Sequence, residues 1–247
     1  MAAVGSSLEP LLGRGLDDAA IRQLTAALDR GSAVSVASGL VGGARALLIV
    51  ALQRATRRPF FVVTSDNAAV ELLRRDIEFF YSAMNGVADA SDDVLALPDS
   101  EADPYDGTSP HAEILEERAN ALLRLARGPV PIVVASLRGA CRRTIEPDAI
   151  IDLAIELVVG TDYRLEHIVD TLLAAGYVRE DPVAAVGEFS TRGGILDVFP
   201  PGRDEPYRVE LFGDSVESIR SFDPETQRST ERVRSILVPP MREQPDR

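Results

Sequence analysis

The stretch GEFSTRGGILDVFP, residues 187–200, gives the clearest indication of a fold in this sequence. It is predicted to form two β-strands on either side of the Gly-Gly pair at 193–194. A second pair, Gly213-Asp214, separates two further runs of alternating residues and is a good signal for a two-residue hairpin. This part of the chain is therefore predicted to be a small α+β domain. The expected strands are 187–191, 195–199, 207–212 and 216–222.

Before this region, short apolar runs alternate with helical patterns. Asp66 is expected to cap a helix, because apolar residues follow it at spacings of three and four. Ser109 and Pro110 are expected to begin a later helix that Gly128 ends. Strands that alternate with helices favour an α/β domain with a parallel sheet covered on both faces. The strands predicted here are 33–37, 60–63, 94–97 and 132–135.

Composition restricts the possible classes of protein. A hydrophobic content of 45% with 26% charged residues is typical of a globular protein rather than a disordered one. The net charge of −13 disfavours non-specific DNA binding and favours a protein partner. One cysteine, Cys141, and two histidines offer neither a disulfide nor zinc-type ligand spacing. Neither a signal peptide nor a membrane-spanning run is recognised, so a cytoplasmic protein is expected.

A strand, a glycine-rich turn and a helix form the setting of a phosphate-binding loop, with the pattern G-x-x-x-x-G-K-[ST]. The matching register here is GLVGGARA, residues 39–46, in which Gly39 is kept and Gly43 is the last glycine of the turn. Ala44 places a methyl group where the backbone approaches phosphate. Arg45 replaces the compact lysine, and Ala46 has no hydroxyl to hold Mg²⁺. Whether this is a degenerate phosphate loop or only a glycine-containing turn, no ATPase activity and no cofactor are expected.

Three segments of the sequence resemble a known family. The stretch 187–200, together with PYRVELFGD at 206–214 and SFDPETQRS at 221–229, closely resembles the module shared by UvrB and the transcription-repair coupling factor (Mfd) family. The segment 97–111 also resembles Mfd. UvrB has an intact phosphate-loop lysine and a tyrosine-bearing hairpin, whereas segment 98–117 here is short, acidic and contains one tyrosine. These departures favour the coupling factors.

The resemblance implies a domain organisation. Residues 1–147 are expected to form a degenerate P-loop domain of RecA-like and UvrB-like type, with an inserted α+β domain at 148–230. Residues 231–247 are expected to return to the first domain, with 236–238 as their strand. The sequence is expected to be the N-terminal part of a longer protein, whose RNA polymerase-binding and DNA-translocating regions lie downstream.

In this family the small domain binds UvrA, and the resemblance assigns its contacts residue by residue. Arg179 and Arg192 match the arginines of the family's motifs, and Glu210 matches its carboxylate. Leu196 is expected to share the strand face of Arg192 and to add an apolar contact. UvrB has a further arginine where this chain has Ser190. From composition alone, Arg179 and Arg192 would instead be ordinary exposed arginines.

Three functional hypotheses follow. The first is a non-catalytic adaptor that recruits UvrA in transcription-coupled repair, with a docking face that other domains of the full-length protein could mask. The second is a nucleotide-binding fragment of an ATP-dependent DNA helicase or translocase. The third, a lesion-binding protein like UvrB, is disfavoured by the acidic charge and the missing hairpin.

Overall fold

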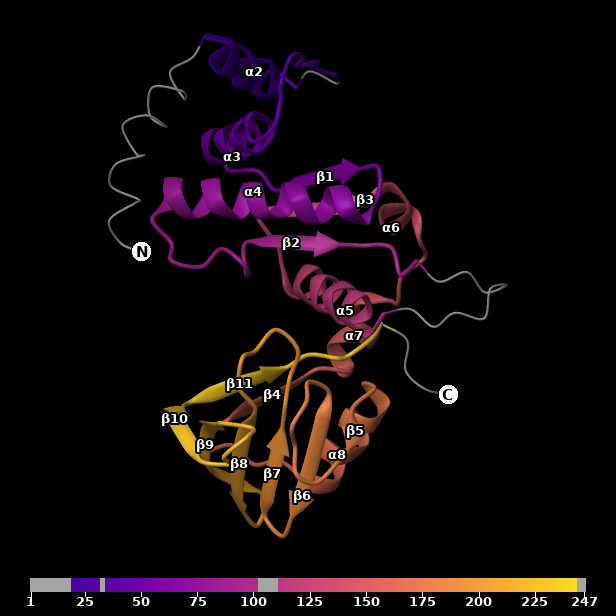
Figure 1. Cartoon of the computed structure of the whole chain (residues 1–247), viewed down its shortest axis with the longest axis vertical. Helices are drawn as coiled ribbons and strands as arrows, with labels where there is room; N and C mark the ends of the chain where they lie inside the picture. Colours follow the sequence, from indigo (N-terminus) through magenta and orange to yellow (C-terminus); the bar gives the residue numbers. More distant parts are fainter. Residues whose placement is uncertain (1–18, 32–33, 102–110, 244–247) are drawn as a thin grey trace. The chain divides into compact units, whose positions relative to one another are not determined.

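The computed structural model describes residues 19–31, 34–101 and 111–243 of the 247-residue chain (Figure 1). Within it, the chain divides into two compact units. Unit 1 comprises Met1–Asp99 and Pro129–Arg142, and unit 2 comprises Ser100–Gly128 and Arg143–Arg247. Helices and strands alternate in unit 1 and strands dominate unit 2, so the α/β prediction is confirmed at the level of fold class.

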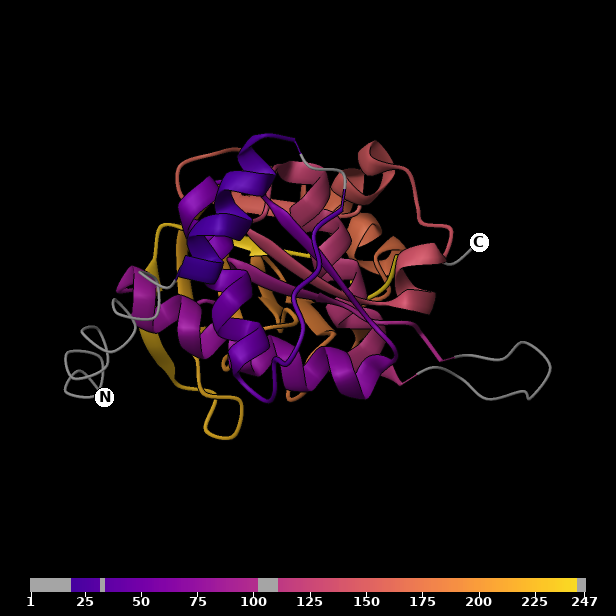
Figure 2. The same ribbon diagram turned by 90° about the horizontal axis from the view of Figure 1, so that it is seen from above.

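Unit 1 is built on a parallel sheet of three strands in the order β1-β3-β2. Helix α4 lies along one face of this sheet and contacts all three strands, and α3 packs on α4 (Figures 1 and 2). The elements in chain order are α2 (Ala19–Asp29), α3 (Ala44–Thr56), β1 (Phe60–Thr64), α4 (Asn67–Asn85), β2 (Val94–Leu97), β3 (Ile132–Ser136) and α6 (Leu137–Cys141).

Helix α4 begins where the sequence predicts. The Asp66 carboxylate accepts a hydrogen bond of 2.8 Å from the backbone N–H of Ala69, which is the N-cap geometry. This bond holds the pKa of Asp66 below its ordinary value. Val70 and Ile77 of the predicted stripe are fully buried against the sheet, and Gly86 ends the helix in the left-handed conformation.

The expected covering of the sheet on both faces is wrong at one strand. Strands β2 and β3 are buried along their whole length, as parallel strands usually are. On β1, however, Phe61 and Val63 are 53% and 49% exposed. β1 and β2 are the two edge strands of this sheet, and within the described chain only β1 leaves one of its faces open.

The strand predicted at 33–37 is also wrong. Ala33 lies outside the described residues, and residues 34–38 adopt no regular secondary structure. Val34 and Val36 are 78% and 84% exposed. A strand needs the backbone hydrogen bonds of a neighbour, and in the described sheet β1 pairs with β3 alone. Alternating valines therefore do not suffice to form a strand here.

Unit 2 contains a six-stranded sheet in the order β10-β9-β8-β7-β6-β5 and a separate pair, β11-β4. Four of its five internal pairings are antiparallel, and β5 pairs in parallel with β6. The elements are α5 (Ala112–Arg127), α7 (Pro147–Asp152), β4 (Ile155–Val158), α8 (Leu165–Ala174), β5 (Val178–Arg179), β6 (Glu188–Arg192), β7 (Ile195–Val198), β8 (Tyr207–Phe212), β9 (Ser215–Phe222), β10 (Ser229–Val233) and β11 (Ser235–Val238).

The two turns that the sequence predicts in this region are confirmed. Arg192 pairs with Ile195 across Gly193-Gly194, and Phe212 pairs with Ser215 across Gly213-Asp214. Gly193 and Gly213 have φ values of +59° and +60°, which glycine adopts without strain. One face of the sheet packs on α8 and on the β4–β11 pair. The shared core includes Leu157, Ile168, Leu172, Phe189, Leu196, Val198, Val209, Ile219 and Ile236.

The C-terminal segment contributes the last strand of the described chain, and its return to the first domain stays a prediction. Residues 236–238 pair antiparallel with β4, where Ile236 lies opposite Leu157. Beyond β11, the Pro239 carbonyl accepts a hydrogen bond of 2.7 Å from the Tyr177 hydroxyl. Glu243 then pairs with the fully buried Arg118 of α5 at 3.0 Å. These contacts explain why the segment remains with unit 2.

Two smaller predictions concern helix ends. Ser109 and Pro110 lie outside the described residues, and α5 has Ala112 as its first residue. Gly128 follows the helix as its C-cap, as predicted. Cys141 is the exposed last residue of the short helix α6.

Candidate functional site

The second face of the six-stranded sheet carries charged and polar side chains. Because side chains alternate along a strand, the core residues Leu196, Val209 and Ile219 point to one face and their neighbours to the other. Cross-strand pairing arranges those neighbours in two rows. The first row is Arg192, Ile195, Glu210 and Ser218, and the second is Ser190, Asp197, Arg208 and Arg220. We call this surface the polar face.

Arg192 ends β6 and is bound by a carboxylate. Its guanidinium donates to both oxygens of Asp181, with Nε 2.9 Å from Oδ2 and a second, shorter bond from Nη2 to Oδ1. The two side chains are 62% and 52% exposed, so the pair remains open to solvent and to a partner. A planar fork of this kind pairs with a carboxylate through two hydrogen bonds, and here Asp181 takes that place.

Arg179 lies at the same edge of the sheet but on the other face. It pairs in register with Phe189, and its guanidinium carbon stands 5.5 Å from the centre of that ring. Its Nη2 donates to the Thr191 hydroxyl at 2.6 Å. The two predicted arginines are therefore both exposed on the β5–β6 edge, and they project from opposite faces of it.

The centre of the polar face contains a shielded ion pair. Arg208 of β8 donates two hydrogen bonds of 2.7 Å to Asp197 of β7. Only 8% of the Asp197 side chain is exposed, and the guanidinium of Arg208 also lies 4.7 Å from the ring centre of Phe222. The hydrogen bond to Asp197 raises the pKa of Arg208. This ion pair joins the neighbouring strands β7 and β8 beneath the exposed side chains of the polar face.

Glu210 has partners of its own in the first row. Its Oε2 accepts a hydrogen bond of 2.6 Å from the Ser218 hydroxyl and a longer one of 3.4 Å from Arg220. About a third of its side chain is exposed. Glu210 is thus positioned, and a second oxygen remains for a donor from outside.

Leu196 is not on the polar face. It is fully buried and pairs with Thr191, whereas Ile195 pairs with Arg192 and is 38% exposed. The expectation that Leu196 shares the strand face of Arg192 is therefore wrong, and Ile195 takes that place. Ser190, where UvrB has a further arginine, is 4% exposed in the second row.

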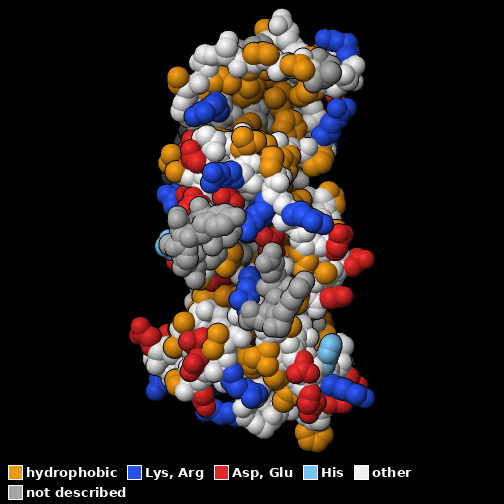
Figure 3. All heavy atoms as spheres, turned by 90° about the vertical axis from the view of Figure 1, so that its right-hand side faces the viewer, with side chains coloured by type: hydrophobic (Ala, Val, Ile, Leu, Met, Phe, Trp, Pro, Cys, Tyr) orange, Lys and Arg blue, Asp and Glu red, His pale blue; other side chains and the backbone are white. Residues whose placement is uncertain are grey.

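Several residues of this surface were not predicted from the sequence. They are Asp181, Ile195, Asp197, Arg208, Phe212 and Arg220. The turn at 193–194 contained the signal for Ile195 and Asp197, because a two-residue turn sets which residues of its two strands lie opposite one another. On the side of the molecule drawn in Figure 3, acidic and basic side chains are interspersed over its lower part.

The loop at 39–46 has a geometry of its own. Gly39 adopts a positive φ of +78°, and a Cβ added at Gly43 would stand 3.2 Å from the Phe80 ring. Ala44 begins α3, and its N–H and that of Arg45 point back to carbonyls of the loop at 3.2 and 3.4 Å. Ala46 is fully buried in the core of unit 1.

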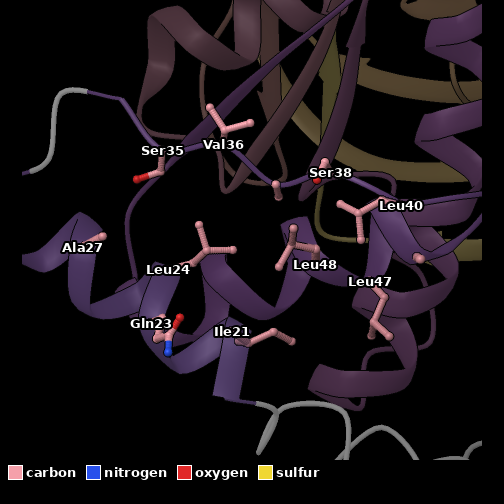
Figure 4. A pocket seen from close by; sticks show the side chains of 12 residues that line it. Ile21, Gln23, Leu24, Ala27, Ser35, Val36, Ser38, Leu40, Leu47 and Leu48 are labelled. Atoms are coloured by element: carbon pink, nitrogen blue, oxygen red, sulfur yellow. The ribbon is translucent and has the colours of Figure 1, made fainter.

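A pocket of about 650 Å³ lies beside this loop, between α2, residues 35–40 and α3 (Figure 4). Leu24, Leu47 and Leu48 project into it from the two helices. All of its lining side chains are apolar or uncharged, so none of them could balance the charge of a triphosphate. The lining residues are Ile21, Gln23, Leu24, Ala27, Ser35, Val36, Ala37, Ser38, Leu40, Ala44, Leu47 and Leu48.

Comparison with known proteins identifies the region that carries the polar face. The family described as "UvrB interaction domain" matches residues 155–243, from β4 to the segment beyond β11. Residues 155–243 are therefore similar to a UvrB interaction domain. Both rows of the polar face, Arg179 and the β4–β11 pair lie within its limits.

The whole chain is also similar to curated transcription-repair-coupling factors. It is 36% identical to that of Myxococcus xanthus over 97% of this chain and 20% of the relative. The identity is 34% with the Bacillus subtilis factor, over 87% of this chain and 18% of the relative. With the Escherichia coli factor it is 30%, over 83% and 17%. The chain thus spans about a fifth of the length of these relatives.

The matched regions include unit 1 as well as the UvrB interaction domain, because 97% of the chain is covered in the first comparison. This extent supports the resemblance of the chain to the transcription-repair-coupling factors over both units. Among the residues that the structure describes, no helix is both long and apolar enough to span a membrane.

Proposed function

We propose that this chain is a non-catalytic adaptor that recruits UvrA in transcription-coupled nucleotide excision repair. The UvrB interaction domain provides the docking surface, and the β5–β6 edge with the first row of the polar face is its centre. The proposed contact residues are Arg179, Arg192 and Glu210. One observation supports this most directly: Arg192 presents a fork that already binds a carboxylate and is still 62% exposed.

The chemistry of the surface favours a protein partner. Arginines on a rigid sheet suit two-bond pairing with carboxylates, and arginine is enriched among the residues that dominate interface energies. The net charge of −13 opposes a nucleic acid backbone. Because Arg179 and Arg192 project from opposite faces of one edge, UvrA is expected to clasp that edge rather than to lie flat on one face.

Unit 1 is proposed to serve as a scaffold without nucleotide chemistry. The buried methyl group of Ala46 and the uncharged pocket beside the loop both support this proposal.

The boundaries 1–147, 148–230 and 231–247 stay predictions for the domain organisation. RNA polymerase and DNA are proposed to bind other regions of the full-length protein, which would act in the cytoplasm and could mask the docking surface.

The test is a binding measurement with purified UvrA. The double variant R179A/R192A should bind UvrA more weakly by about 2–4 kcal/mol in sum, or roughly 30- to 1000-fold. Both side chains are exposed, so the thermal unfolding of the variant should match that of the parent chain. R164A/R203A, which removes two exposed arginines outside the proposed surface, is the matched control. Parental affinity in R179A/R192A would reject the assignment.

A further inference from the structure

The last residue of β8, Phe212, is exposed to an unusual degree. Its exposed fraction is 77%, compared with 53% and 52% for Phe61 and Phe79, the other exposed phenylalanines of the described chain. An isolated exposed apolar residue is common and needs no explanation. The surroundings of Phe212 therefore decide whether its exposure has a function.

Strand alternation places Phe212 on the polar face. Val209 and Leu211 of β8 are buried in the core, so Arg208, Glu210 and Phe212 point the other way. Phe212 follows Glu210 by two positions and therefore lies next to it on that face. Its cross-strand partner, Ser215, is too small to cover an aromatic ring.

The neighbouring hairpin leaves the ring uncovered on its other side. The pairing of Ile195 with Glu210 places Gly193 opposite Phe212 when the register is extended by two residues. The N–H of Leu211 donates to the Gly194 carbonyl at 2.7 Å, which confirms that turn and strand lie side by side. A Cβ at Gly194 would stand 2.4 Å from the Leu211 carbonyl oxygen, so no side chain fits there.

Phe212 is also near a second exposed apolar side chain. Ile195 is 38% exposed and stands between Arg192 and Glu210 in the first row of the polar face. Ile195 and Phe212 flank the β6–β7 and β8–β9 turns, and Figure 1 shows these two turns together at one end of the six-stranded sheet. An aromatic and an aliphatic residue with an arginine and a carboxylate at their sides match the composition of an interface centre.

We propose that Phe212 and Ile195 form the apolar anchor of the surface that binds UvrA, with Arg192 and Glu210 at its margin. This inference rests on the proposed function and adds the residues that would exclude water from the charged contacts. The partner surface is expected to have an apolar depression for the Phe212 ring. A carboxylate should lie beside it towards Arg192, and a basic or N–H group towards Glu210.

The experiment compares F212A with the parent chain in binding to purified UvrA. The substitution should weaken binding by about 10- to 100-fold, which is typical for an aromatic residue at an interface centre. The loss should persist when salt is raised, because apolar burial is not screened, whereas the loss in R192A should shrink. L173A, which removes a 47% exposed leucine from α8, is the control and should leave affinity unchanged.

Three outcomes separate this inference from the proposed function. Absence of UvrA binding by the parent chain would reject both. Weak binding by R192A together with parental binding by F212A would overturn the anchor and leave the docking surface in place. Concentration-dependent self-association of the parent chain that F212A abolishes, with no effect on UvrA binding, would also overturn it. Partial recovery of affinity in F212L would support the anchor, because leucine restores apolar area without the ring.

Discussion

Asp181 occupies the guanidinium fork of Arg192, with 2.9 Å between Oδ2 and Nε and a second bond to the other carboxylate oxygen. The surface that is proposed to receive a partner carboxylate is therefore already bound by one from its own chain. Since more than half of each side chain is exposed, this internal bond is weak enough to be exchanged.

This exchange leads to the first prediction. D181N should raise the affinity for UvrA by about two- to fivefold, because an exposed ion pair contributes roughly 0–1 kcal/mol and Asp181 competes with the partner. Titration calorimetry at low ionic strength measures the effect. D170N removes the same charge from the exposed surface of α8 and should have no effect. Weaker binding of D181N would mean that Asp181 positions Arg192 instead of competing for it.

The second prediction concerns the pair Asp197–Arg208. A double-mutant cycle of D197N and R208Q should give a coupling free energy of about 1–2 kcal/mol in urea unfolding, because the carboxylate is nearly buried and both of its oxygens accept hydrogen bonds. The pair Arg127–Glu156 is 40% and 52% exposed and should give less than about 0.5 kcal/mol. Equal coupling in the two cycles would contradict the assigned role of burial.

The third prediction is a pH dependence. Asp66 has a pKa below its ordinary value of 3.8, chiefly because its carboxylate accepts the N–H of Ala69. A group with a lowered folded-state pKa stabilises the fold above its unfolded-state pKa, and this stabilisation is lost as the pH falls through the folded-state value. The melting temperature of D66A should therefore lie below that of the parent chain at neutral pH. The difference should disappear in acid, and a constant difference at all pH values would exclude this cause.

The fourth prediction concerns the loop at 39–46. Millimolar Mg-ATP should leave the melting temperature of the chain unchanged, since a ligand raises it only by binding the native state. Ala46 is buried and the neighbouring pocket has no charged lining, which are the reasons for this expectation. A reproducible rise that requires both Mg²⁺ and ATP would favour the nucleotide-binding alternative instead.

Turn residues and helix caps allowed much of the fold to be predicted. Gly193-Gly194 and Gly213-Asp214 determine their turns locally, and Asp66 caps α4 through its own side chain. The strand expected at 33–37 does not form, because a strand depends on a partner that the local sequence does not contain. Likewise, residues 236–238 form an apolar run that is typical of a strand. Their partner, β4, lies far away in the sequence, so the local sequence does not predict this pairing.

The misplacement of Leu196 has a simple geometric origin. Arg192 and Leu196 are four positions apart, and residues an even number apart share a face within one strand. A two-residue turn lies between them, and across such a turn positions i and i+3 face each other. Ile195 therefore accompanies Arg192, and Leu196 accompanies Thr191 in the direction of the core. Assigning the turn first would have identified the right residue.

Strand β5, at the β5–β6 edge, consists only of Val178 and Arg179. Such a short edge strand offers few main-chain N–H and C=O groups for hydrogen bonds, so an incoming peptide could not extend the sheet there as a further strand. Recognition of a partner at the β5–β6 edge must therefore depend on side chains, so single substitutions can change its affinity. The same brevity should discourage stacking of identical molecules into fibrils when the protein is concentrated.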